Sequence, residues 1–169
     1  MTASMSDFVV DKSEWFCEQN VVASVVIYLK RDGWIIKSIA DTESRARGAD
    51  ILAQKDGRTL IVEVKGYPST VYARGPKKGK DKPTKPGVQA RHWYSHLLLD
   101  ALLRQSEHPS AEIAIALPKF PVFTKLIART QTALTKPGID LFLVSETTTV
   151  QCARAVAQVQ SLAVEPLEQ

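Results

Sequence analysis

A two-residue turn at Asp56 and Gly57 constrains the fold of this chain more than any other feature of its sequence. Aspartate and glycine tolerate the positive φ angles that a type I′ turn requires, and runs rich in apolar residues flank the pair on both sides. We therefore predict that residues 51–55 and 58–65 form the antiparallel strands of a β-hairpin. This register depends on a turn of two residues, because an odd-numbered loop would shift the pairing of the first strand.

The register of this hairpin brings acidic and basic side chains together. If the turn closes symmetrically, Leu52 lies opposite Ile61 and Asp50 lies opposite Glu63. Carboxylates placed directly across a ladder repel each other, and each raises the pKa of the other unless a cation lies between them. Lys65 shares a face with Glu63, since side chains alternate along a strand. We therefore expect Asp50, Glu63 and Lys65 to converge on one spot, with a divalent cation between the carboxylates.

Asp50, followed by Glu63-Val64-Lys65 on the next strand, resembles the motif of the PD-(D/E)xK nuclease superfamily, which has the restriction-endonuclease-like fold. A D…ExK pattern also arises by chance, and a strand that alternates charge with valine is commonly a half-solvated strand. Here the context makes the resemblance specific, because a glycine precedes the aspartate closely, a tight turn follows, and the second strand is apolar on its other face. Ala49 stands where the family often has proline, a replacement that the family tolerates.

The resemblance implies hydrolysis of phosphodiester bonds in nucleic acid, in DNA rather than RNA. The oxygens of Asp50 and Glu63 are hard ligands that suit Mg²⁺ or Mn²⁺, and the family adds the backbone carbonyl of Val64 as a further ligand. Lys65 would orient the attacking water, help to deprotonate it and balance charge on the scissile phosphate. Family members that cut duplexes commonly dimerise, so we expect a homodimer.

The rest of the sequence predicts an α/β fold with a mixed central sheet flanked by helices, the single-domain core that the resemblance requires. Apolar spacing and turn signals predict the order helix, three strands, helix, strand, helix, strand. Helices are expected at 11–31, 88–105 and 123–134, and strands at 34–40, 51–55, 58–65, 112–117 and 139–145. A marginal helix is expected at 151–162, and frayed termini at 1–10 and 163–169.

Two of these helices offer further candidate site residues. Many PD-(D/E)xK nucleases bring a glutamate from the first helix to the metal, and the resemblance makes Glu14 the candidate, with Glu18 on the same helical face as the alternative. An acidic residue in a first helical turn also has a purely structural role, because it interacts favourably with the helix dipole. Gln89, at the start of the next helix, is similar in placement to a glutamine that approaches the site in some relatives.

The segment between Thr70 and Pro86 carries six basic residues and one acidic residue, a larger excess than the net charge of +4 for the whole chain. Its glycines and prolines predict a mobile connection at 67–87 that is neither helix nor strand. Such a run is commonly a solvated loop, but this one leaves directly from the Lys65 end of the site. We expect it to contact phosphates together with one residue of the following helix. The residues concerned are Lys77, Lys78, Lys80, Lys82, Lys85 and Arg91.

Length and composition exclude several other classes of protein. With 169 residues, 44% of them hydrophobic and 24% charged, the chain fits one globular domain that can bury a core. Its longest apolar run, 21–29, is far short of the ~20 residues that cross a bilayer, and we expect no signal peptide and no membrane partner. Cys17 and Cys152 lack metal-ligand spacing and indicate neither a disulfide framework nor a zinc site, so we expect a cytoplasmic protein.

Two other kinds of protein fit parts of this pattern. A non-catalytic nucleic-acid-binding module on a degenerate nuclease fold would need the basic segment but not the carboxylates. A structural or interaction domain with an accidental ExK pattern would leave Asp50 facing Glu63 without compensation. The presence of Asp50, Glu63 and Lys65 in one register favours the nuclease.

Overall fold

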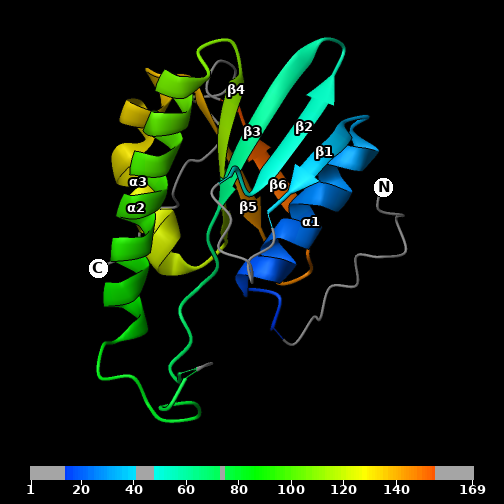
Figure 1. Ribbon diagram of the computed structural model, residues 1–169. Helices are drawn as coiled ribbons and strands as arrows, with labels where there is room; N and C mark the ends of the chain where they lie inside the picture. The colour runs from blue at the N-terminus through cyan, green and yellow to red at the C-terminus, as the bar shows by residue number, and fades with distance from the viewer. Residues whose placement is uncertain (1–13, 41–47, 73–74, 155–169) are drawn as a thin grey trace.

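The computed structural model describes residues 14–40, 48–72 and 75–154, which form a six-stranded mixed sheet packed against three helices (Figure 1). The helices are α1 (Glu18–Arg31), α2 (Pro86–Glu107) and α3 (Pro121–Thr135). The strands are β1 (Ile35–Ile39), β2 (Ile51–Lys55), β3 (Arg58–Val64), β4 (Glu112–Pro118), β5 (Ile139–Val144) and β6 (Val150–Ala153). The predicted α/β class, with a mixed sheet flanked by helices in one domain, is confirmed. None of the described helices is both long enough and apolar enough to cross a membrane.

The strands lie in the sheet in sequence order, from β1 at one edge to β6 at the other. The first three form an antiparallel meander, β3, β4 and β5 run parallel, and β6 is antiparallel to β5. Helices α2 and α3 form the two crossovers that parallel pairing requires. The carboxyl ends of β3, β4 and β5 therefore lie together at one end of the strands. Open α/β sheets commonly bind ligands at that end.

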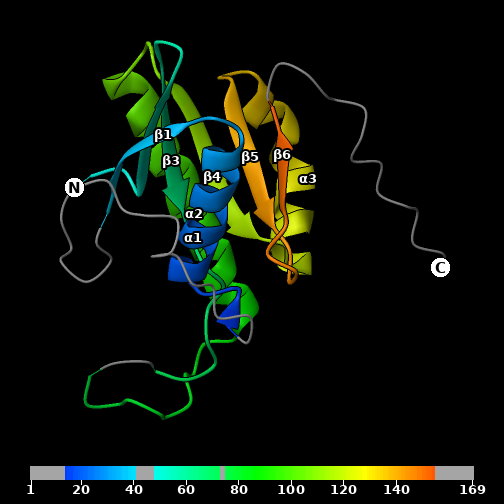
Figure 2. The same ribbon diagram turned by 90° about the vertical axis from the view of Figure 1, so that its right-hand side faces the viewer.

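The sheet separates two hydrophobic cores. Helix α1 covers one face of the sheet, and α2 and α3 cover the other (Figure 2). Val25 of α1 belongs to the same core as Val62, whereas Leu97 of α2 and Phe123 of α3 belong to the same core as Ile61. Successive residues of β3 point to opposite faces, so this central strand contributes to both cores.

The hairpin of β2 and β3 has the predicted register. Leu52 pairs with Ile61, and both turn residues have positive φ, 50° at Asp56 and 76° at Gly57. The ladder ends at the first residue of β2, so Asp50 lies just before the strand. The two-residue turn fixes this alignment, as the sequence predicted.

Two predicted elements differ from the structure by more than two residues at an end. Helix α1 begins at Glu18 rather than at residue 11, and residues 11–13 lie outside the described part of the chain. The helix predicted at 151–162 is wrong at residues 151–153, which belong to β6; residues 155–162 are outside the described part. The edge of β5 offers backbone N–H and C=O groups that need partners, and pairing with β6 outweighs a weak local preference for helix. The predicted frayed termini also lie outside the described residues.

The basic segment between β3 and α2 projects from the end of the sheet at which β3 finishes (Figure 1). Val71 and Asp81 form an isolated antiparallel bridge. Backbone hydrogen bonds also join the Tyr72 N–H to the Lys80 carbonyl and the Lys82 N–H to the Thr70 carbonyl. The segment is therefore not wholly irregular, and its mobility stays a prediction.

Candidate metal centre

Strand β3 carries Glu63 into the interior at the carboxyl end of the parallel strands. The strand lies between β2 and β4 and has a helical layer on each face, so its last five residues are all buried. Glu63 is only 5% exposed. A strand covered on both faces is normally apolar throughout, and a buried carboxylate is unfavourable unless it has charged or hydrogen-bonding partners. The partners of Glu63 therefore define the site.

Asp50 is held beside the end of β3 at both its backbone and its side chain. Its Oδ2 accepts a hydrogen bond of 2.6 Å from the backbone N–H of Val64. Its own carbonyl accepts a hydrogen bond of 2.9 Å from the N–H of Ala40, at the end of β1. These contacts keep the carboxylate near Glu63, and the two negative charges interact.

Arg104 of α2 forms an ion pair with Glu63. Its Nε donates a hydrogen bond of 2.6 Å to Oε1 of Glu63, and its Nη1 lies 3.3 Å from Oε2 of Glu107. Burial raises the pKa of Glu63 above the usual 4.5, the hydrogen bond from Arg104 opposes that shift, and the charge of Asp50 adds to it. The Glu63 carboxylate is thus subject to opposing electrostatic influences.

The sequence predictions did not include Arg104, although a signal for it was present. Leu97, Ala101 and Arg104 recur at helical spacing on α2, and the first two are fully buried. A cation on the apolar face of a helix needs an anion nearby, because an unpaired buried charge is strongly unfavourable. That spacing could have predicted an acidic partner on the strand beneath α2.

The start of α1 supplies a third carboxylate. Oε2 of Glu18 lies 3.7 Å from Nζ of Lys65, and the backbone N–H of Gly66 donates a hydrogen bond to the same carboxylate. Burial raises the pKa of Glu18, Lys65 lowers it and the charge of Asp50 raises it. Glu18 therefore interacts with the cation and with one of the carboxylates of the predicted site.

Glu14 was the first candidate for the glutamate of this helix, but its surroundings differ from those of Glu18. Its side chain is exposed, and its backbone carbonyl accepts hydrogen bonds from the Cys17 N–H and from Nδ2 of Asn20. These bonds are made just before the first turn of α1. Of the two glutamates, Glu18 is the one whose carboxylate contacts Lys65.

Gly66 allows α1 to approach the end of β3. A Cβ atom at this position would lie 2.5 Å from the backbone N of Glu18 and 2.9 Å from the backbone O of Phe16. The next residue, Tyr67, donates its N–H to the same Phe16 carbonyl at 2.8 Å. Backbone atoms cannot move aside as a flexible side chain can, so the position of Glu18 depends on glycine here.

Gln89 lies at a different level of α2 from the Glu63 ion pair. It comes fifteen residues before Arg104, which corresponds to about 22 Å along the helix axis. Its Oε1 is buried and has no hydrogen-bond partner among the residues that the structure describes. The structure therefore brings Glu18 and Arg104, but not Gln89, to the group formed by Asp50, Glu63 and Lys65.

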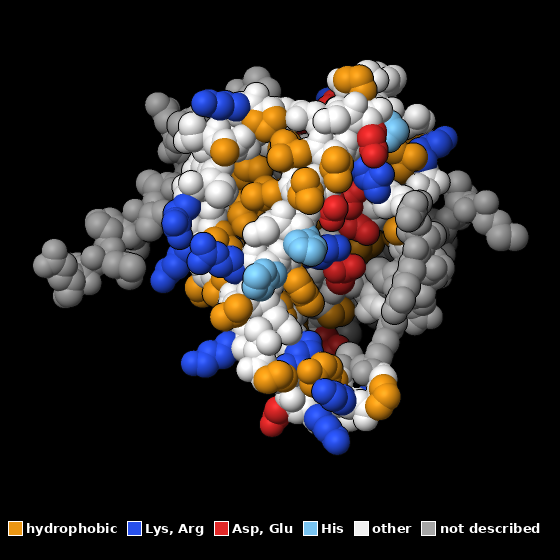
Figure 3. Space-filling view, turned by 60° about the vertical axis from the view of Figure 1, so that its left-hand side comes forward, with side chains coloured by type: hydrophobic (Ala, Val, Ile, Leu, Met, Phe, Trp, Pro, Cys, Tyr) orange, Lys and Arg blue, Asp and Glu red, His pale blue; other side chains and the backbone are white. Residues whose placement is uncertain are grey.

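The basic residues predicted to bind nucleic acid lie at the surface. Arg91 and the lysines of the segment are exposed, except for Lys82, which is half-buried. The Nζ atoms of Lys77 and Lys82 lie 5.8 and 5.9 Å from the centre of the Tyr72 ring, within the range of a cation–π interaction. Figure 3 shows basic side chains around the lower projection of this face and a band of acidic side chains above it. An acidic side chain also lies on the projection and basic side chains lie beside the acidic band, so the two signs of charge are only partly separated on this face.

Carboxylate oxygens are the kind of donor that a hard divalent cation prefers. Among residues 14–40, 48–72 and 75–154, no three or more His, Cys, Asp and Glu side chains form a ready metal cage. Mg²⁺, however, usually binds one or two protein carboxylates, with waters and substrate phosphate oxygens completing its coordination. Among the described residues, Glu18 pairs with Lys65 and Glu63 pairs with Arg104, and the charge of Asp50 raises the pKa of both glutamates.

Comparisons with known proteins leave the function open. No protein-family model matches this chain, and no curated protein matches it. A crystal structure of an XisH family protein from Nostoc punctiforme is similar over 78% of this chain and 95% of that chain, with 14% sequence identity and a TM-score of 0.45. So loose a likeness transfers no activity to this chain, and a functional assignment depends on the geometry of its own residues.

Proposed function

We propose that this protein is a metal-dependent nuclease of the PD-(D/E)xK type that hydrolyses phosphodiester bonds in DNA. One observation carries the proposal: the Asp50 carboxylate is hydrogen-bonded to the end of β3 and interacts with the buried Glu63, two residues before Lys65. The fold alone would not support it, because one fold hosts many functions. The arrangement supports a site at which two carboxylates and a lysine act on one phosphate.

Asp50, Glu63 and the backbone carbonyl of Val64 would hold Mg²⁺ or Mn²⁺. Such an ion, when bound, supplies Lewis-acid stabilisation of a phosphoryl oxygen and lowers the pKa of a coordinated water. Lys65 presents an ammonium group that can orient the attacking water and balance negative charge on the scissile phosphate. Glu18 contacts that ammonium group at 3.7 Å and so limits the positions it can take.

Metal binding by the intact protein tests this proposal most directly. We expect titration with Mg²⁺ or Mn²⁺ to give a heat of binding and a rise in melting temperature, both lost in Asp50→Ala because a ligand is removed. Glu146→Ala is a matched control, since Glu146 is an exposed carboxylate in the turn between β5 and β6. No response in the wild type, or an unchanged response in Asp50→Ala, would show that the metal site is wrong.

The basic segment would bind the phosphates of the substrate. Replacing Lys77, Lys78 and Lys80 with alanine should weaken DNA binding and reduce the salt dependence of the binding constant, because each phosphate contact releases counterions. A matched control with the same change of charge is available in the exposed basic residues of α3 and its C-terminus: Lys125, Arg129 and Lys136. An unchanged salt slope in the first variant would identify the segment as a solvated connection.

A non-catalytic nucleic-acid-binding module is the alternative function, and the ion pair between Arg104 and Glu63 is the observation that favours it. A protein that no longer binds metal would need another cation to neutralise its buried glutamate. Such a module would bind DNA equally well with and without Mg²⁺ and would not cleave it. Cleavage that requires Mg²⁺ and is lost in Asp50→Ala would exclude the module.

A further inference from the structure

Arg104 contacts the most buried carboxylate of the site, although it belongs to no part of the D…ExK motif. Its Nε lies 2.6 Å from Oε1 of Glu63, and the two side chains are 25% and 7% exposed. Burying an ion pair removes both charges from water, and an apolar pair of similar volume is often as stable or more stable. The ion pair is therefore weak evidence for a purely stabilising role.

We propose that Arg104 competes with the divalent cation for Glu63, and that Glu107 retains the arginine when the cation binds. This inference rests on the proposed nuclease function. A guanidinium group and a metal ion neutralise the same carboxylate, and two cations close to one oxygen repel each other strongly in a site of low dielectric constant. Arg104 would therefore have to withdraw its Nε from Oε1 of Glu63 for the carboxylate to hold a metal ion.

Glu107 is placed to receive the displaced arginine. Nη1 of Arg104 already lies 3.3 Å from Oε2 of Glu107, three residues further along α2. The Glu107 side chain is 56% exposed, so an arginine that turns toward it moves to the surface. Contacts between residues three apart on a helix are available without movement of the backbone. The displaced guanidinium therefore keeps an anionic partner.

Asp100 provides a useful contrast one turn earlier on α2. Its negative charge acts on Glu63 and is among the causes that raise the pKa of that carboxyl. Removing the charge of Asp100 should weaken metal binding by simple electrostatics, whatever residue occupies position 104. Removing the charge of Glu107, by contrast, should weaken metal binding only when Arg104 is present.

Mg²⁺ affinity, measured by calorimetry on the intact protein, tests the proposal. Arg104→Gln should bind Mg²⁺ about tenfold more tightly than the wild type, because the competing cation is gone. Arg104→Lys should remain close to the wild type. Arg58→Gln is a matched control, since Arg58 forms an exposed ion pair with Glu112 at the other end of β3, and it should leave the affinity unchanged.

Glu107→Gln gives an independent test in the opposite direction. It should weaken Mg²⁺ binding about threefold, because the displaced arginine loses its partner, and this effect should vanish in an Arg104→Gln background. Asp100→Asn should weaken binding equally in both backgrounds. Because Glu107 is exposed, this variant should fold even if Arg104→Gln does not, and an unchanged Mg²⁺ affinity in Glu107→Gln would then overturn the proposal.

The outcomes separate this inference from the proposed function. If the wild type and Arg104→Gln bind Mg²⁺ with equal constants, or if Glu107→Gln has the same effect in both backgrounds, the competition is overturned and the nuclease proposal stands. If neither the wild type nor any of these variants binds Mg²⁺ or Mn²⁺, the nuclease proposal itself is overturned. A lower melting temperature of Arg104→Gln with unchanged affinity would assign Arg104 a structural role only and overturn the inference.

Discussion

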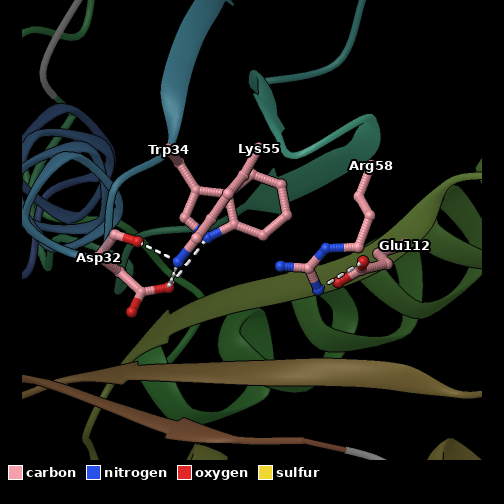
Figure 4. A network of polar contacts seen from close by, with 5 residues as sticks. All are labelled: Asp32, Trp34, Lys55, Arg58 and Glu112. Carbon is pink, nitrogen blue, oxygen red and sulfur yellow. Dashed lines mark hydrogen bonds and ion pairs between the residues drawn. The ribbon is translucent and has the colours of Figure 1, made fainter.

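The two ends of the β2–β3 hairpin both carry charged side chains, but they pair them differently. At the turn end each cation has its own carboxylate: Lys55 contacts Asp32, and Arg58 lies 3.0 Å from Glu112 (Figure 4). Trp34 joins the two pairs, because its Nε1–H donates to Asp32 and its ring centre lies 5.1 Å from the Arg58 guanidinium. At the opposite end, among the described residues, the charge of Asp50 acts on two glutamates that each pair with a cation, Glu18 with Lys65 and Glu63 with Arg104, and Glu63 is buried.

This difference supports the proposed site at the end of the hairpin opposite the turn. Partly exposed one-to-one ion pairs such as those of Lys55 and Arg58 contribute about 0–1 kcal/mol to stability. Burial raises the pKa values of Glu18 and Glu63, because it removes their carboxylates from water, and the charge of Asp50 adds to both shifts. Ionisable groups with perturbed pKa values at the carboxyl end of a parallel sheet are typical of functional sites.

The largest expected difference between the two ends is in catalysis. Glu63→Gln should lower the rate of Mg²⁺-dependent plasmid cleavage by at least about a hundredfold, because a ligand that stabilises developing charge is lost. Glu112→Gln removes a carboxylate from the turn end and should change the rate by less than about twofold. Comparable cleavage by the two variants would mean that the ends do not differ in function.

A second difference concerns the glycines at the two ends. Gly66→Ala should lower the free energy of unfolding by about 2–3 kcal/mol, since its Cβ would meet backbone atoms of α1 that cannot give way. Gly57→Ala has open space around its Cβ but a φ of +76°, so a loss of about 1 kcal/mol from backbone strain is expected. Urea denaturation measures both values. An equal loss in the two variants would show that the close approach of α1 is not tight.

The smallest expected difference between the two ends is in how the free energy of unfolding of the metal-free protein depends on pH. A carboxyl whose pKa is raised by folding retains its proton to a higher pH than in the unfolded chain, so its contribution to stability is lost as pH rises. The free energy of unfolding should therefore fall as pH rises above 4.5, the ordinary pKa of Glu18 and Glu63. Thermal denaturation in a chelator should show a smaller fall in Glu63→Gln. Glu112→Gln serves as control, and an identical fall in both variants would contradict the prediction.

Much of the hairpin could be predicted from the sequence, because the residues that determine it are neighbours along the chain. The Asp56–Gly57 pair specifies the turn, and the turn specifies the pairing of Leu52 with Ile61. The choice between Glu14 and Glu18 could not be made in this way, because it depends on where α1 begins. Strand β6 was missed for a related reason, since its four residues have little strand signal until the edge of β5 lies beside them.

The sequence by itself determined the turn, the register and the order of charged residues along β3, since these depend on backbone preferences and on the alternation of side chains. Only the tertiary structure decided that Glu63 is buried, that Glu18 contacts Lys65 and that Arg104 holds Glu63. Arg104 lies 41 residues from Glu63 in the sequence. Their contact exists because α2 packs its apolar face on the sheet, and the packing of whole elements, rather than any local preference, sets the charge balance of the site.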